Sequence, residues 1–130
     1  MILRIARHTT NLEDLKTFYT EILGLQLLGA FQNHDGYDGV FIGEAHLNWY
    51  LEFTTSSATP MQNFNEDDLL VFYPESEFAY QAILEKIQAH GIPVVPAKNP
   101  YWNKNGIVIK DPDGYGVIIS ALKINRDSHD

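Results

Sequence analysis

Hydrophobic and polar positions alternate over short stretches and recur at helical spacing over longer ones, which predicts a chain of strands and helices. A strand is expected over residues 2–9, and the apolar positions from Leu12 to Leu23 then predict a helix. Gly24 is expected to end this helix. After a further strand over 25–31, a polar turn is expected at 33–39, with strands at 40–43 and 46–53.

The same order of elements is expected a second time, after a polar stretch that contains a proline. A strand is predicted over 68–73, followed by a helix that runs from Phe78 and ends at Gly91. The remaining predicted strands are a short one at 92–95 and a closing hairpin of 101–110 with 115–122.

A repeat relates the two sets, because LGLQLLG after the first helix aligns with HGIPVVP after the second. The sequence therefore predicts an α+β fold of two tandem β-α-β-β-β units. Each unit alone would leave one sheet face bare, so the units are expected to form a curled mixed sheet around a cleft. We expect one domain over 1–130, divided into repeat one at about 2–54, a linker at 55–66, repeat two at about 67–122 and a polar tail at 123–130.

The tetrapeptide Asp111-Pro112-Asp113-Gly114 lies between two apolar runs and predicts a tight turn. The side chain of Asp111 can cap the turn, Pro112 presets φ, and Gly114 accepts a positive φ. With Tyr115 after it, this hairpin resembles that of the vicinal oxygen chelate superfamily, which includes glyoxalase I, extradiol dioxygenases, fosfomycin-modifying enzymes and bleomycin-resistance proteins. The resemblance covers residues 2–122, points to an uncharacterised glyoxalase-like subgroup, and implies the glyoxalase/bleomycin-resistance fold.

Metal-binding members of that superfamily take their ligands from four strands. The resemblance assigns the first three positions to His8, Glu52 and Asp68, with Asp67 in place of Asp68 if the register slips by one. The fourth position is Ile118, which cannot bind a metal. The resemblance therefore implies a degenerate metal site.

The residues themselves leave the roles of His8 and Glu52 open. His8 can bind a metal through a neutral imidazole nitrogen, or form a local hydrogen bond at the end of a strand. Glu52 lies inside an apolar strand, where a charge is costly unless it is paired or coordinated. Alternation puts it on one face with Tyr50, and this face either lines a cleft or meets solvent.

Aromatic residues exceed what a core of this size needs. Tyr101 and Trp102 are expected in a loop before the closing hairpin, where they would cover a cavity or a partner chain. His34 and Tyr37 lie in the polar turn and are expected near the same rim, with Tyr50 as a further wall. These five residues are the predicted ligand-binding set.

Composition narrows the class of protein. The 130 residues suit one compact domain, and the net charge of −8 argues against a nucleic-acid partner. The absence of cysteine excludes disulfides, thiol catalysis and thiolate metal sites. No apolar run is long enough for a membrane helix and no signal peptide is evident, so a cytoplasmic protein without a membrane partner is expected.

Together these observations predict a small-molecule binding protein of the glyoxalase/bleomycin-resistance type. It is expected to use no cofactor and to form a homodimer. The alternative is a divalent-metal-dependent lyase or isomerase with Ni, Zn, Mn or Fe on His8, Glu52 and Asp68. In that enzyme Glu52 would be catalytic, alternating between metal ligand and general base. A structural dimer without any ligand is a third possibility, so whether the chain is an enzyme is left open.

Overall fold

The computed structural model describes residues 1–124 and divides into two compact units, Met1–Asn63 and Phe64–Asp130. Each unit is a mixture of helices and one sheet, as the α+β prediction requires. Most of the expected polar tail, residues 125–130, lies outside the described residues. Within residues 1–124, no helix has the length and apolar character that crossing a membrane demands.

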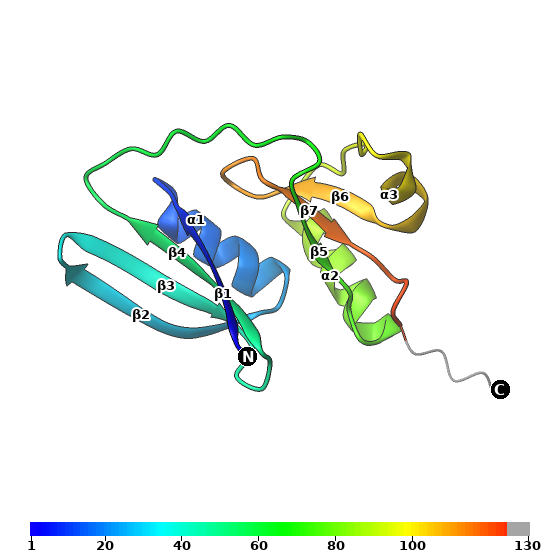
Figure 1. Ribbon diagram of the computed structural model, residues 1–130. Coiled ribbons are helices and arrows are strands. Elements are labelled where there is room, and N and C mark those ends of the chain that lie inside the picture. The colour runs from blue at the N-terminus through cyan, green and yellow to red at the C-terminus, as the bar shows by residue number, and fades with distance from the viewer. Residues whose placement is uncertain (125–130) are drawn as a thin grey trace. The chain divides into compact units, whose positions relative to one another are not determined.

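The first unit contains four strands and one helical segment, as the first repeat predicts (Figure 1). Its elements are β1 (Leu3–His8), α1 (Leu12–Thr17), the π-helix η1 (Phe18–Ile22), β2 (Gln26–His34), β3 (Tyr37–Gly43) and β4 (Trp49–Thr55). The strands form sheet A in the order β1-β4-β3-β2, with β1 parallel to β4 and the other pairs antiparallel. The last strand begins at Trp49 rather than at residue 46, because a turn occupies the residues before it.

The predicted first helix changes its hydrogen bonding halfway along. After α1, the N–H of Leu23 donates to the carbonyl of Phe18 at 3.2 Å, the i→i+5 bond of a π-helix. The side chains of Phe18 and Tyr19 are buried, and the Tyr19 ring stacks on Phe53 with centroids 5.1 Å apart. Since Phe53 and Leu51 alternate on the same side of β4, the helical segment covers that face of sheet A.

The second unit repeats the order in a reduced form. Its elements are β5 (Leu69–Phe72), α2 (Glu77–Ala89), α3 (Pro100–Asn105), β6 (Ile107–Lys110) and β7 (Gly116–Ile119). Sheet B has the order β5-β7-β6, with β5 parallel to β7 and β6 antiparallel to it. The hydroxyl of Ser76 caps α2 by accepting from the N–H of Ala79 at 3.0 Å.

Two expectations for the second unit are wrong. Residues 92–95 form no strand but only an isolated bridge between Val95 and Val108, and Pro93 has no N–H with which to extend a ladder. Residues 101–110 do not form one strand, since α3 occupies its first half. The Asn99 side chain caps α3 by accepting from the N–H of Tyr101 at 3.0 Å, and Pro100 begins the helix.

The turn before the last strand agrees with its sequence. The N–H of Gly114 donates to the carbonyl of Asp111 at 2.8 Å, and Gly114 has φ of 88°. The buried carboxylate of Asp111 accepts from the N–H groups of Asp113 at 2.9 Å and Tyr115 at 3.1 Å. This network sets the exit of the chain into β7, all four residues of which are buried.

Candidate ligand-binding site

One face of sheet A carries polar and aromatic side chains, opposite the face that α1 and η1 cover. On β4, Glu52 alternates with the buried Leu51 and Phe53, so it lies on the uncovered side. Strand pairing and alternation then identify the neighbours of Glu52 on the adjacent strands. We call this surface the Glu52 face; its larger side chains are Arg4, His8, Phe31, Tyr37, Phe41, Tyr50, Glu52 and Thr54.

Three aromatic rings form a row across β2, β3 and β4 on this face. The rings of Phe31 and Phe41 have centroids 5.7 Å apart, and those of Phe41 and Tyr50 are 5.9 Å apart. The Phe31 ring lies directly over Gly39, where an added Cβ would come within 2.4 Å of it. Because Gly39 has no side chain, the Phe31 ring can lie against the sheet.

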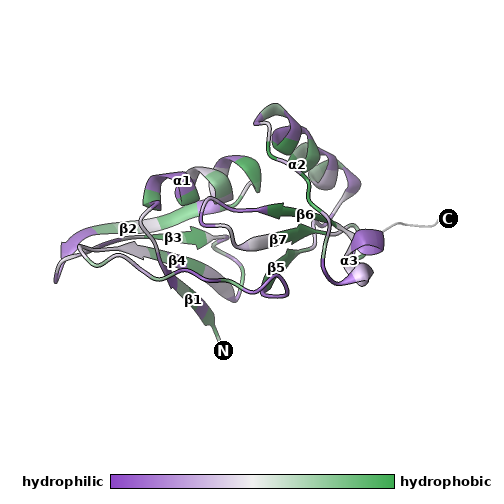
Figure 2. Cartoon of the chain, turned by 90° about the horizontal axis from the view of Figure 1, so that it is seen from above, coloured by the Kyte–Doolittle hydropathy of each residue, from purple (hydrophilic) through white to green (hydrophobic). Residues whose placement is uncertain are grey.

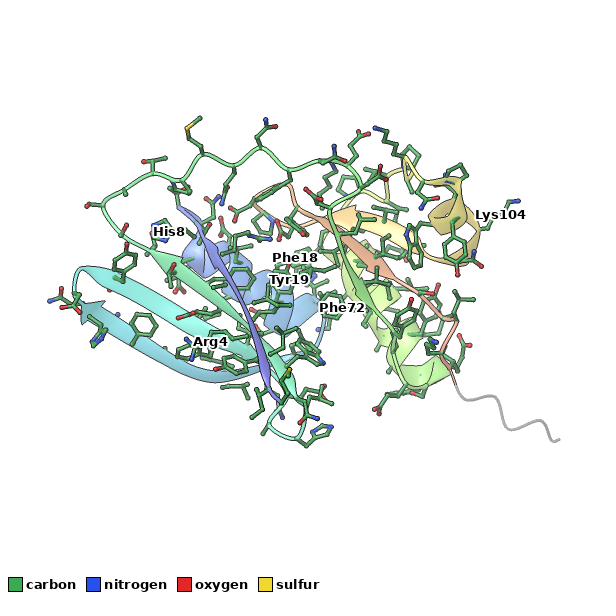
Figure 3. All side chains as sticks on the ribbon, viewed as in Figure 1. Arg4, His8, Phe18, Tyr19, Phe72 and Lys104 are labelled. Atoms are coloured by element: carbon green, nitrogen blue, oxygen red, sulfur yellow. The ribbon has the colours of Figure 1, made fainter. Side chains whose placement is uncertain are left out.

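Arg4, labelled in Figure 3, is a residue of β1. Its side chain contacts two rings of this row and joins them to Glu52. Its guanidinium carbon is 5.5 Å from the centroid of Phe41 and 5.4 Å from that of Tyr50. Its Nε donates to the Tyr50 hydroxyl at 2.9 Å, and Nη1 lies 3.5 Å from Glu52 Oε1. The hydrogen bond to Tyr50, and then the Glu52 carboxylate, raise the pKa of Arg4, so the guanidinium is always charged.

His8, at the end of β1, is held by hydroxyl groups at both ring nitrogens. Nδ1 lies 2.8 Å from Thr54 Oγ1, and Nε2 lies 2.9 Å from Ser56 Oγ. The ring also meets that of Tyr37 edge-on, with centroids 5.6 Å apart. The backbone carbonyl of His8 accepts from Gln62 Nε2 at 2.8 Å, so main chain and side chain are both fixed.

A divalent metal does not fit these residues in the arrangement that they adopt. Both nitrogens of His8 are engaged by hydroxyls, and a metal would have to displace Thr54 or Ser56. The carboxylate of Glu52 faces the fixed positive charge of Arg4, which opposes a second cation. Within residues 1–124, no three His, Asp or Glu side chains lie close enough together to hold a metal ion.

The predicted third and fourth ligand positions belong to the second unit. Asp68 is exposed and precedes β5, and its Oδ2 accepts from the N–H of Asn65 at 3.3 Å. Asp67 donates its backbone N–H to Asn65 Oδ1 at 2.8 Å in the same turn. Ile118 is fully buried on β7. A metal-ligand role for Asp68 stays a prediction.

The predicted aromatic walls differ in their surroundings. The expected turn at 33–39 is shorter, because β2 runs to His34 and β3 begins at Tyr37. Tyr37 is exposed, and the ring of His34 lies 6.2 Å from that of Phe31. Tyr101 and Trp102 were expected in a loop but lie on α3, with their rings edge to face at 4.8 Å. Both belong to the second unit, and their role beside the Glu52 face stays a prediction.

The sequence reasoning missed Arg4, Phe31 and Phe41. Arg4 could have been found, because it lies at an even spacing from His8 on β1 and therefore shares its face. Phe41 could not, because its place opposite Glu52 depends on the register between β3 and β4. Phe31 depends in addition on irregularities in the pairing of β2 with β3.

Comparisons with known proteins identify relatives of the whole chain. Family models match residues 3–54 (YycE-like N-terminal domain) and residues 67–121 (YycE-like C-terminal domain). The uncharacterized protein YycE of Bacillus subtilis (strain 168) is 40% identical over 124 residues, which cover 93% of this chain and 88% of that protein. A Bacillus subtilis YycE crystal structure, described as glyoxalase/fosfomycin resistance type, has a TM-score of 0.81 at 36% identity and covers 99% of this chain and 93% of its own.

Two more distant structures share the fold. The trypanothione-dependent glyoxalase I of Leishmania major has a TM-score of 0.71 at 20% identity, covering 92% of this chain and 85% of that one. The antibiotic-binding protein TnmS3 from Streptomyces sp. CB03234 has a TM-score of 0.64 at 18% identity, covering 92% of this chain and 93% of that one. These two likenesses show the glyoxalase/bleomycin-resistance fold. The predicted resemblance to glyoxalase-like proteins is confirmed by the YycE structure.

Proposed function

Because the chain belongs to the YycE-like family and has the glyoxalase/fosfomycin-resistance type of fold, we propose that it is a small-molecule binding protein that uses the Glu52 face of sheet A. The observation that carries this proposal is the aromatic row with Arg4 across it. Rings that are only half-buried, beside a few fixed polar groups, are the usual lining of a small-molecule site.

The polar anchors of the proposed site are His8 and Glu52, and its walls include Tyr50 and Tyr37. His8 is held by two hydroxyls and Glu52 by Arg4, so both are presented in defined orientations. His34 contributes to the rim, and a ligand-binding role for Tyr101 and Trp102 stays a prediction. The metal site of the superfamily is degenerate in this proposal, and no metal takes part in binding.

A metal-dependent lyase or isomerase is the second candidate. The observation in its favour is that His8 and Glu52, two residues apart in the register of β1 with β4, lie on the same face. To hold a divalent cation, His8 would have to leave one hydroxyl partner and Glu52 would have to leave Arg4, with Asp68 as a further ligand. Glu52 would then be the proton-transferring residue.

Metal content tests the two candidates against each other. The protein is purified without chelator and its nickel, zinc, manganese and iron are measured by inductively coupled plasma mass spectrometry. Binding without a metal predicts less than one equivalent, and the same metal content in wild type and His8→Ala. One tightly held equivalent that His8→Ala loses would contradict the degenerate site and favour the lyase.

A cytoplasmic homodimer is the proposed state of the protein. The support is that apolar side chains, among them Leu3 at 57% and Ile5 at 41%, are exposed along β1. Such side chains on an edge strand favour association with a second copy. Sedimentation equilibrium at micromolar concentration measures this directly, and a monomer at every concentration would contradict it.

A further inference from the structure

The charge that the Glu52 face presents to solvent is positive, although the chain as a whole has a net charge of −8. The side chain of Arg4 is 51% exposed, whereas that of Glu52 is 13% exposed. Resting on the proposed function, we infer that the molecule bound on the Glu52 face is planar and carries a carboxylate, which pairs with Arg4.

The hydrogen-bonding capacity of Arg4 is only partly used. A guanidinium has five N–H donors, of which Nε serves the Tyr50 hydroxyl at 2.9 Å. Nη1 makes a single long contact of 3.5 Å with Glu52 Oε1. Within residues 1–124, Nη2 donates to no acceptor, so the outer edge of the guanidinium can take the two oxygens of a carboxylate.

Arg4 is also preorganised for such a ligand. Its guanidinium lies on the rings of Phe41 and Tyr50 and is tied at Nε, so little freedom is lost when an anion binds. Glu52 is the positioning residue: its carboxylate lies 3.5 Å from Nη1 and is itself only 13% exposed. The hydroxyl of Tyr50 likewise positions Nε.

The planar part of the ligand is inferred from the aromatic row. Phe31, Phe41 and Tyr50 lie side by side at centroid separations of 5.7 and 5.9 Å, and each ring is partly exposed. An aromatic ligand can stack on Phe31, next to the two rings on which Arg4 lies, while its carboxylate reaches Arg4. A cationic ligand of the same shape is disfavoured, because Glu52 is already paired and Arg4 repels it.

The test uses three probes of nearly equal size and shape: benzoate, neutral benzamide and cationic benzamidinium. Each is titrated into the full-length protein while ¹H–¹⁵N NMR follows the Arg4 Nε–H and the backbone amides of Phe41 and Tyr50. A charge-assisted hydrogen bond to Arg4 should make the Kd of benzoate about tenfold lower than that of benzamide. Benzamidinium should bind more weakly than benzamide.

Two charge-matched variants identify the residue responsible. Arg4→Met removes the guanidinium but keeps an unbranched stem, and it should make benzoate and benzamide bind equally. Lys86→Met makes the same change in net charge on α2, in the second unit, and should leave the preference intact. Glu52→Gln should reduce the preference for benzoate while benzamide binding stays the same, as expected of a positioning residue.

The outcomes separate this inference from the proposed function. Equal binding of the three probes by the wild type, or an unchanged preference in Arg4→Met, overturns the carboxylate inference but leaves a binding face in place. If no probe changes the amide chemical shifts of the Glu52 face at any concentration up to the solubility limit of the probe, both the inference and the proposed function are overturned. Circular dichroism of each variant confirms that it is folded before titration.

Discussion

The two sheets have the same strand register but opposite chemistry on one of their faces. In sheet A, Phe41 pairs with Glu52, and in sheet B, Val108 pairs with Ile118 in the corresponding place. The corresponding residues of this face, first unit against second, are Arg4 and Leu69, Tyr50 and Gly116, Glu52 and Ile118, Phe41 and Val108. The face is thus polar and aromatic in the first unit and mostly aliphatic in the second.

The other faces of the two sheets agree with each other. On the last strand, Leu51 and Phe53 of the first unit correspond to Val117 and Ile119 of the second, and all four are buried. The polar face of sheet A still distinguishes it from sheet B. In Figure 2, the strands of sheet B are hydrophobic along most of their length, whereas β1 alternates in hydropathy. Core packing constrains one face of each repeat, and the other face is free to take up different chemistry.

Ile118 belongs to the aliphatic face of sheet B. The superfamily's metal-binding members have a carboxylate at this position. Ile118 is fully buried, and an added Cβ on Gly106 would come within 2.8 Å of its Cγ2. An aliphatic side chain fills this space without an unpaired charge. This face is thus apolar in the second unit, and the polar chemistry lies in the first.

The largest expected effect comes from introducing the missing carboxylate into the second unit. Ile118→Glu should lower the free energy of unfolding by roughly 3–5 kcal/mol near neutral pH, because an unpaired charge is then buried. Burial raises the folded-state pKa of that carboxyl above its unfolded value of about 4.3, so stability is lost as the pH rises from there. Urea denaturation at several pH values measures the change.

Ile118→Gln is the control for this substitution, because it has the same shape without the charge. The difference between the two variants should widen as the pH rises. Equal stabilities of Ile118→Glu and wild type at neutral pH would contradict the apolar surroundings of Ile118. Recovery of the lost stability on addition of zinc or manganese would instead favour the metal-dependent candidate.

A smaller loss is expected when the aromatic row is displaced in the first unit. The Cβ of Gly39→Ala would meet the Phe31 ring at 2.4 Å and the carbonyl of Phe53 at 3.2 Å. The cost should be about 1–3 kcal/mol of unfolding free energy. Gly29→Ala is the matched control in the neighbouring strand, since its Cβ would lie 3.4 Å from Phe41. Denaturation midpoints for both variants decide the point, and equal midpoints would contradict the placement of Phe31.

A substitution at Phe41 tests whether the aromatic row distinguishes the first unit from the second. Phe41→Val gives the first unit the residue that Val108 provides in the second, and removes one of the two rings beneath Arg4. Because Phe41 is only half-buried, stability should fall by about 1–2 kcal/mol. Benzoate binding by NMR titration should weaken more than Val108→Ala weakens it. A loss of equal size in both variants would mean that the Glu52 face is not the binding surface.

The smallest effect on stability is expected at the Arg4–Glu52 pair. Glu52→Gln should change the free energy of unfolding by about 1 kcal/mol or less, since Arg4 is half-exposed and the contact is long. The thermal midpoint should differ little between the variant and wild type at moderate salt. A loss of several kcal/mol would show that Glu52 holds the fold together rather than orienting Arg4 for a ligand.

Much of the fold could be predicted because its signals are local. The helical spacing from Leu12, the capping of the Asp111 turn and the positive φ of Gly114 each depend on a few neighbouring residues. The repeated order of these locally predicted elements indicated two similar units. Where a local signal was overlooked, as with Asn99 and Pro100 before α3, a helix was mistaken for the beginning of a strand.

The site was predictable only in part. Alternation along β4 alone put Glu52 and Tyr50 on one face, away from Leu51, and the structure has them so. Alternation does not identify the residue that forms an ion pair with the carboxylate of Glu52. That partner is Arg4, far away along the chain. The engagement of both His8 nitrogens likewise depends on Thr54 of β4 and on Ser56, just after this strand.

Local patterns in the sequence were therefore sufficient for most of the elements, their order and which residues of a strand share a face. Period-two and helical spacing follow from backbone geometry. Long-range contacts, in contrast, place Arg4 on Phe41 and Tyr50 and enclose Ile118. The reason is that strand register brings together residues from distant parts of the chain, and a shift by one residue would turn every side chain to the other face.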